Sequence, residues 1–250
     1  MIAIFGAFGQ EIVDLRRRMV VEEVVATPAC KVYRGKLHNK DAVLVRTGMG
    51  KERAENATRF VLERYPVTAI ISLGFAGALA PNLRVGDVVV CSKLHCVHSF
   101  EDEEERLEPH AADAGLHSLA LQCPEDRVAR FLAGSGVTAL QLDPDPEKMQ
   151  ELRDAFDAHI IDMESYWIAR MASARQIPFI AIRSISDTVE RSVQPFDRIL
   201  APDGSLLWKK AVLCFLLHPR YLMNVFALFR NTRPAKKNMA AFVSHLVTRI

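Results

Sequence analysis

The sequence predicts a single-domain α/β protein with three layers, in which helices cover both faces of a mixed, mostly parallel sheet. Short apolar runs alternate with helical patterns of about 10–15 residues, which is typical of crossover connections between parallel strands. The chain has 250 residues and half of them are hydrophobic, enough for one large core. Glycine turns follow several of the apolar runs. Since ligands bind at the carboxyl ends of such strands, these turns mark the expected site.

The predicted elements are short apolar strands and periodic helices, and most strands end at glycine or an acidic residue. The strands are predicted over residues 2–5, 42–46, 67–73, 87–92, 159–162 and 179–183, and the helices over 10–19, 52–64 and 164–175. The first strand ends at Gly6, the second in Thr47-Gly48-Met49-Gly50, and the third at Gly74. A turn at Gly86 precedes the fourth. From about His98 to Pro146 the pattern is weaker, with an acidic run over 101–105 expected in a solvated loop and a rigid turn over 143–146.

The C-terminal segment differs from the rest in charge. After Asp203 it contains no Asp or Glu, while Lys, Arg and aromatic residues are frequent. We therefore divide the chain into a catalytic domain over 1–203 and a helical extension over 204–250. Breaks at His218-Pro219 and Arg233-Pro234 predict three short helices. Two interpretations stay open: helices packed on the sheet with a basic face in water, or peripheral contact of 205–250 with an anionic membrane.

Composition excludes several classes of function. A net charge of +2 argues against nucleic-acid binding by the whole chain. The five cysteines are scattered and odd in number, and no signal peptide or membrane span is expected, which favours the cytoplasm. The spacing of Cys91, His95 and Cys96 does not match a zinc site. We expect no metal and no organic cofactor.

Three acidic residues lie where a strand ends or a helix begins: Glu11, Glu164 and Asp187. A single carboxylate near a helix N-terminus is more often a cap or a partner of the helix dipole than a functional group. Their setting makes the three candidates for catalysis, because each follows an apolar run at the edge where ligands bind.

The motifs around these residues resemble the nucleoside phosphorylase and nucleosidase superfamily. The blocks over 71–79, 83–90, 161–165 and 178–187 are similar to its motifs in order and spacing. The opening Gly6-Ala7-Phe8-Gly9-Gln10-Glu11 resembles the methylthioadenosine/S-adenosylhomocysteine nucleosidases. The resemblance covers most of residues 1–190, with a gap over about 98–155.

The resemblance implies roles for individual residues in cleaving the N-glycosidic bond of a purine nucleoside. Glu164 would hold the ribose hydroxyls and Met163 would pack on the sugar. Asp187, oriented by Ser186, would donate a proton to N7 of the base, and Glu11 would activate water. This chemistry needs a carboxylate beside the cationic sugar and a protonated acid beside the leaving base.

Glycine turns and their neighbours complete the expected substrate-binding set: Gly48, Gly74, Phe75 and Ala76. Phosphorylases of this superfamily have an arginine two residues before the central glycine, where this chain has Ser72. Hydrolysis is therefore favoured over phosphorolysis, although Arg46 could still hold phosphate. A non-catalytic nucleoside-binding or membrane-docking module is the alternative of another class.

The motifs identify the base and the 5′ substituent of the nucleoside less clearly than they identify the reaction. The Gly-Asp-Ala-Phe segment with which the nucleosidases bind adenine is missing, and Leu142-Asp143-Pro144 stands near its place. The block over 162–165 and the basic tail resemble a hopanoid-associated branch that acts on adenosylhopane, a membrane lipid. That resemblance implies a role in hopanoid biosynthesis at the inner membrane surface. A homodimer is expected from base rates.

Overall fold

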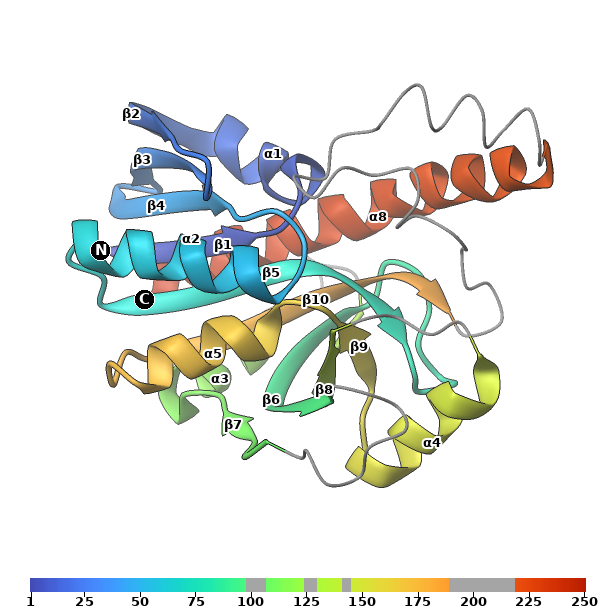
Figure 1. Ribbon diagram of the computed structural model, residues 1–250. Coiled ribbons are helices and arrows are strands. Elements are labelled where there is room, and N and C mark those ends of the chain that lie inside the picture. Colours follow the sequence, from blue (N-terminus) through green and yellow to red (C-terminus); the bar gives the residue numbers. More distant parts are fainter. Residues whose placement is uncertain (98–106, 124–129, 141–144, 189–218) are drawn as a thin grey trace.

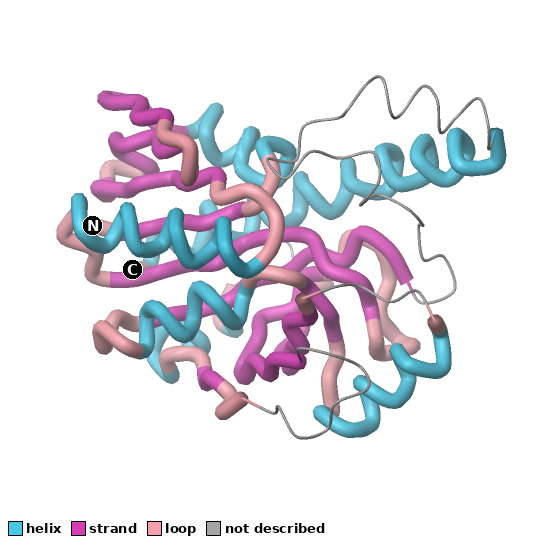
Figure 2. Tube along the Cα trace, in the orientation of Figure 1, coloured by secondary structure: helices cyan, strands magenta, loops and turns pink. Residues whose placement is uncertain are grey.

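The computed structural model describes residues 1–97, 107–123, 130–140, 145–188 and 219–250, with the backbone alone for 219–232. It has one central sheet with helices packed on both faces (Figures 1 and 2). The predicted three-layer α/β fold is thereby confirmed. The acidic run over 101–105, residues 143 and 144 of the predicted turn and the tail over 204–218 lie outside the described residues.

Within the described residues the sheet contains ten strands in the order β10-β6-β8-β9-β5-β1-β4-β3-β2, with β7 paired to β6. They are β1 (Ile2–Gly6), β2 (Met19–Ala26), β3 (Lys31–Leu37), β4 (Lys40–Arg46), β5 (Ala69–Ala78), β6 (Val88–Val97), β7 (His110–Ala111), β8 (Phe131–Ala139), β9 (Ile160–Asp162) and β10 (Phe179–Thr188). Strand β10 also pairs with β5. The ring β5-β9-β8-β6-β10 therefore closes into a small barrel, and β1, β4, β3 and β2 extend from it.

The sheet is mixed, as expected, but antiparallel pairs are as numerous as parallel pairs among the described strands. Parallel pairs join β1 to β4 and β5, β10 to β5, and β8 to β6 and β9. The β2-β3-β4 meander, β6 beside β7 and β10, and β5 beside β9 are antiparallel. The parallel part is the one that gathers the carboxyl ends of β1, β4, β5 and β10.

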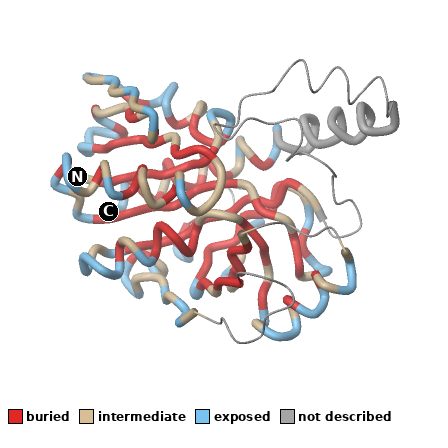
Figure 3. The backbone as a smooth tube through the Cα atoms, viewed as in Figure 1, coloured by how far each residue is buried: buried red, intermediate tan, exposed pale blue. Residues whose placement is uncertain are grey.

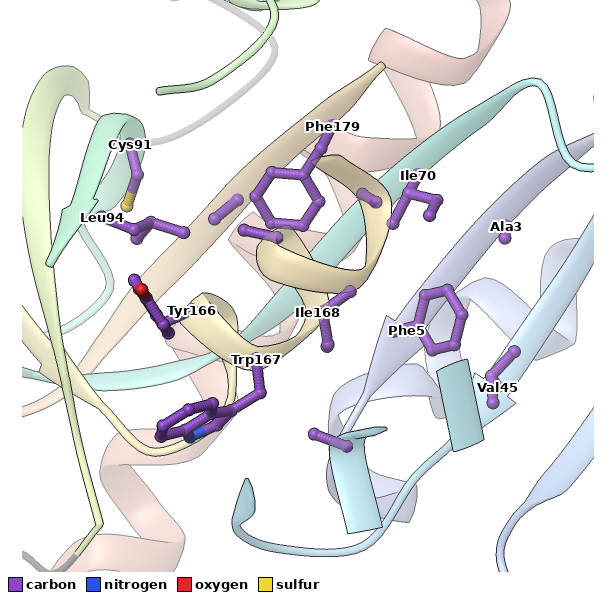
Figure 4. Close-up of a cluster of buried hydrophobic side chains, with 14 of the residues drawn as sticks. Ala3, Phe5, Val45, Ile70, Cys91, Leu94, Tyr166, Trp167, Ile168 and Phe179 are labelled. Atoms are coloured by element: carbon purple, nitrogen blue, oxygen red, sulfur yellow. The ribbon is translucent and has the colours of Figure 1, made fainter. Parts of the chain in front are cut away.

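Helices form the outer layers, and each buries one apolar side against the sheet. They are α1 (Gly9–Arg18), α2 (Lys51–Arg64), α3 (Ala114–Leu121), α4 (Pro146–Phe156), α5 (Ser165–Ser173) and α8 (Pro219–Arg249). One core cluster joins α2 and α5 to one face, and a second joins α1, α3 and α8 to the other. Figure 3 shows the buried strands between them, and Figure 4 shows Phe179 and Ile70 packed beside Ile168 of α5.

The tail corrects one prediction. Helix α8 continues through Pro234, so the break expected at Arg233-Pro234 is wrong. Proline removes one backbone donor from a helix. Burial beyond it compensates, because Met239, Phe242 and Val243 are fully buried against the sheet. The packed interpretation therefore holds for the last turns of the tail. No helix in the described part of the chain is long and apolar enough to cross a membrane.

Candidate active site

The predicted site residues converge where β1, β4, β5, β9 and β10 end. Glu11 lies in the first turn of α1, directly after β1 and its Gly6 turn. Glu164 is the N-cap of α5, two residues after β9 ends at Asp162. Asp187 is near the end of β10, opposite Gly77 of β5. The structure thus places all three carboxylates at the same end of the sheet, and Glu11 lies close enough to Glu164 for its charge to raise the pKa of Glu164.

Glu11 is buried, and two backbone groups orient it. Its Oε2 accepts a hydrogen bond from the Phe8 N–H at 2.8 Å, and its Oε1 accepts one from the Phe75 N–H at 2.8 Å. Burial raises the pKa of Glu11, while these backbone bonds and the charge of Arg183 oppose the rise. The result is a carboxylate of increased basicity that is held between the β1–α1 turn and β5.

A buried ion pair lies beside Glu11. Arg183 on β10 donates from Nε to Asp162 Oδ2 at 2.7 Å. Its Nη1 donates to the backbone oxygens of Ser72 and Ile182 at 3.0 and 3.1 Å, and its Nη2 donates to the Ser72 hydroxyl at 2.9 Å. Asp162 also accepts from Thr138 Oγ1 at 2.6 Å and from the hydroxyl of Ser165. Every nitrogen of the guanidinium has a protein acceptor.

Glu164 is less well compensated. Its Oε1 accepts a hydrogen bond from the Gly50 N–H at 2.8 Å, at the start of α2. Gly50 has a φ of 89°, which only glycine adopts without strain. Burial and the neighbouring charge of Asp162 raise the pKa of Glu164 to about 8, opposed by the Gly50 bond. Additional hydroxyl donors from a ligand would stabilise its charged form.

Asp187 has the properties of a proton donor. Burial raises its pKa, and the bond from Ser186 opposes the rise. The Ser186 hydroxyl donates to Asp187 Oδ1 at 2.5 Å and also lies 3.4 Å from the backbone oxygen of Ala76. A β-bulge between Ile185 and Asp187 changes the register there. Ser186 is the extra residue of this bulge, and Asp187 resumes the pairing opposite Gly77 of β5.

The remaining predicted residues lie on the same strand ends and turns as these carboxylates. Phe75 and Met163 are half-buried, and Ala76 is buried in β5. Gly48 has a φ of 84°, and its N–H donates to the backbone oxygen of Ala7. Arg46, the possible phosphate ligand, ends β4 and has its Cδ 4.0 Å from where a Cβ on Gly9 would lie.

Sequence reasoning missed the ion pair of Asp162 and Arg183, although both residues stand in the quoted motifs. A charged residue that closes an apolar strand, as Arg183 closes 179–183, is the signal that could have identified it. Among the described residues, no group of three or more His, Cys, Asp or Glu side chains could hold a metal ion. Cys91 and Cys96 are buried, and burial raises the pKa of each thiol to about 12.

Comparison with known proteins identifies the family. The model of the phosphorylase superfamily matches residues 1–203, and the chain belongs to this superfamily. It is an enzyme, as predicted. It is similar to the 5′-methylthioadenosine/S-adenosylhomocysteine nucleosidase of Tolumonas auensis, with 33% identity over 74% of this chain and 85% of the relative. The Haemophilus ducreyi nucleosidase is 31% identical over 76% and 86%.

Solved structures show the same fold. The Neisseria meningitidis nucleosidase in complex with methylthio-immucillin-A superimposes with a TM-score of 0.78 at 23% identity, covering 100% of this chain and 99% of that one. The futalosine hydrolase of Helicobacter pylori superimposes with a TM-score of 0.78 at 18% identity, covering 100% and 97%.

Proposed function

We propose that this enzyme hydrolyses the N-glycosidic bond of a purine nucleoside, namely a 5′-substituted adenosine. The observation that carries the proposal is the grouping of Glu11, Glu164 and Asp187, three carboxyl groups whose pKa values are all raised. Sequence relatives that are nucleosidases support it. A protein that only bound a nucleoside would have no need of a protonated acid beside the base.

The proposed reaction uses each carboxyl group differently. Asp187 gives its proton to N7 of the base as the bond between C1′ and N9 breaks, so the base leaves neutral. Glu164 accepts hydrogen bonds from the ribose hydroxyls and stabilises the cationic sugar. Water adds to C1′ and gives its proton to Glu11, whose basicity burial has increased.

Water is favoured over phosphate as the nucleophile. The Arg183 guanidinium is already bonded to Asp162, Ser72 and Ile182, so it has no free edge for a dianion. Glu11 beside it would repel an anion. Arg46 is the residue through which phosphorolysis could still occur.

The test measures base release from 5′-methylthioadenosine and adenosine, with and without phosphate, for the wild type and Asp187→Asn. We expect free adenine and free sugar without phosphate, and a loss of about 10²–10⁴-fold in kcat for the variant. A ribose 1-phosphate product that requires phosphate would instead establish a phosphorylase. If neither small nucleoside is cleaved despite binding, the substrate is a lipid-linked nucleoside or the chain is a binding module, and base release from adenosylhopane decides between the two.

The finer proposal is that the 5′ substituent is a membrane lipid such as the hopane of adenosylhopane, presented at the inner membrane surface. The tail is the feature that supports it. Residues 219–232 include Arg220, Arg230 and several aromatic and aliphatic residues, and the first turns of α8 extend beyond the sheet (Figure 1). Basic and aromatic side chains together favour anionic lipid surfaces, at about 1 kcal/mol per basic residue.

Truncation of the whole tail cannot test this proposal, because its last turns are part of the core. The full chain with Arg220→Glu and Arg230→Glu should lose binding to phosphatidylglycerol vesicles, while Lys237→Glu, an exposed residue on the packed part of α8, should retain more of it. Equal vesicle binding by both proteins would contradict membrane contact.

Hydrolysis of adenosylhopane, with poor turnover of small nucleosides, is the expected substrate profile. The boundary at residue 203 and the homodimer stay predictions.

A further inference from the structure

We propose that Asn238, on the C-terminal helix α8, is a positioning residue for Asp187. This inference rests on the proposed function, in which Asp187 is the acid. The side-chain amide of Asn238 bonds the turn at Gly86. It acts through the turn that precedes β6 and through the backbone of β10.

The first step is the contact between α8 and that turn. The Asn238 Nδ2 donates a hydrogen bond to the backbone oxygen of Gly86 at 2.8 Å. Gly86 has a φ of 92°, which favours glycine, and a Cβ there would lie 3.2 Å from Asn238 Nδ2 and 3.4 Å from Pro234 Cβ. Absence of a side chain at Gly86 therefore lets α8 approach the turn closely.

The second step runs from the turn to β10. The Gly86 N–H donates to the backbone oxygen of Ile185 at 2.9 Å, and the Ile185 N–H donates to the backbone oxygen of Asp87 at 2.9 Å. The regular pairing of β10 with β6 ends at Ser184. The turn thus continues the ladder by one residue and fixes Ile185 on the side opposite β5.

The third step is the short distance from Ile185 to the acid. Ser186 forms the bulge, and Asp187 follows it, paired with Gly77 of β5. A bulged residue leaves the ladder, so the direction of Asp187 depends on what holds the residue before the bulge. That residue is Ile185, which the turn under Asn238 holds.

Buried residues on either side of Asn238 hold its side chain against the Gly86 turn. Ala235 and Met239 on either side of it are fully buried, which fixes this part of α8 on the sheet. At the same turn, Asp87 Oδ2 accepts from the Arg84 N–H at 2.9 Å and lies 3.7 Å from Arg130 Nη1. A neutral variant at position 238 is therefore preferable to Asp, which would add a charge beside Asp87.

The experiment compares Asn238→Leu, which keeps the approximate shape but loses the donor, with Ser244→Ala. Ser244 is a matched control on the same helix, because its hydroxyl bonds His38 of the β3–β4 turn and not the catalytic strand. We expect both variants to lower the melting temperature. Only Asn238→Leu should reduce kcat, by about 10-fold with KM changed less than about twofold, as for a misaligned acid. The alkaline limb of the kcat–pH profile of Asn238→Leu should also move to lower pH. A displaced Asp187 is better solvated and therefore loses its proton more readily.

Amide hydrogen exchange at Gly86 and Ile185 gives a readout that needs no substrate. Asn238→Leu should accelerate exchange at both amides, and Ser244→Ala should not. If the wild type releases no base, the proposed function fails, and the exchange rates still decide the coupling. Unchanged exchange at Ile185, or an unchanged kcat and alkaline limb in a turning-over enzyme, would show that Asn238 only holds the helix. If Asn238→Leu does not fold, Asn238→Ser is measured and interpreted in the same way.

Discussion

Two carboxylates at the same end of the sheet, Asp162 and Glu164, have opposite surroundings. Asp162 accepts hydrogen bonds from Thr138, Ser165, the Glu164 N–H and Arg183. Glu164, two residues later, accepts from the Gly50 N–H within the described part of the chain, and its pKa is raised to about 8. Thus the protein satisfies one carboxylate completely and leaves its neighbour dependent on a ligand.

The difference separates two kinds of site residue. The pair of Asp162 and Arg183 is a closed network, which orders the strand ends but offers little to a substrate. Glu164 and Asp187 are destabilised as anions by burial, which is the usual cost of preparing groups for catalysis. Substitutions in the pair of Asp162 and Arg183 should therefore lower stability, whereas substitutions of Glu164 or Asp187 should lower activity.

The largest expected effect is on stability, from Asp162→Asn. Removing one partner leaves the Arg183 charge buried and uncompensated, which should lower the free energy of unfolding by about 3–5 kcal/mol. Urea unfolding at fixed protein concentration measures it as a lower midpoint with an unchanged slope. Asp154→Asn is the control, since Asp154 is exposed and pairs with Arg153 at the surface. Equal losses in the two variants would refute a structural role for the buried pair.

Substitution of Glu164 by Gln, unlike Asp162→Asn, should mainly lower activity. We expect kcat/KM to fall about 100-fold, because the amide cannot stabilise a cationic sugar. Its stability should also respond to pH. A folded pKa of about 8, above the ordinary 4.5, means that Glu164 contributes stability below about pH 4.5 and loses it as pH rises to 8.

Glu164→Gln should therefore lose less stability than the wild type between pH 5 and 8, by roughly 1 kcal/mol per pH unit at most. Thermal unfolding across that range measures the difference. Glu63→Gln, on the exposed surface of α2, should follow the wild type. A wild type whose stability rises over this range in parallel with the Glu164 variant would show that Glu164 is ionised without ligand.

The sequence predicted the carboxylates better than their partners. Glu11 and Glu164 are visible because each follows an apolar strand, so local pattern places it at the ligand edge. The bond from Arg183 to Asp162 joins strands that do not pair with each other. It depends on the closure of the barrel through β10, which no local pattern encodes.

Among the elements, the core strands were predicted because their apolar runs are continuous. Strands β2, β3 and β8 were among those missed. Strand β2 begins at Met19, directly after α1 ends, without a turn to separate them. Strand β8 contains Gly134 and Gly136, and glycine weakens the pattern by which a strand is predicted. A Cβ on Gly134 would lie 2.9 Å from His159, so packing between strands requires that glycine.

Gly74→Ala tests how closely Glu11 and Arg183 pack against the backbone of β5. A Cβ there would lie 3.1 Å from Glu11 Oε1 and 3.3 Å from Arg183 Cζ. We expect a loss of about 1–3 kcal/mol in stability from overpacking and a decrease in kcat as Glu11 shifts. At Gly9, in the first turn of α1, the nearest atom is Arg46 Cδ at 4.0 Å. Gly9→Ala should therefore leave stability unchanged or slightly higher, and equal losses at both glycines would contradict the close approach.

The smallest expected effect comes from Ser72→Ala, inside the closed network. It removes the hydroxyl that accepts from Arg183 Nη2, while the Ser72 backbone oxygen still accepts from Nη1. One bond to a charged donor should cost about 1.5 kcal/mol in urea unfolding, well below the cost of Asp162→Asn. Ser173→Ala, at an exposed position of α5, should change stability by less than about 0.5 kcal/mol. If Ser72→Ala costs as much as Asp162→Asn, the network depends on its full set of hydrogen bonds and not on charge, and the contrast between Asp162 and Glu164 would then be one of bonding geometry.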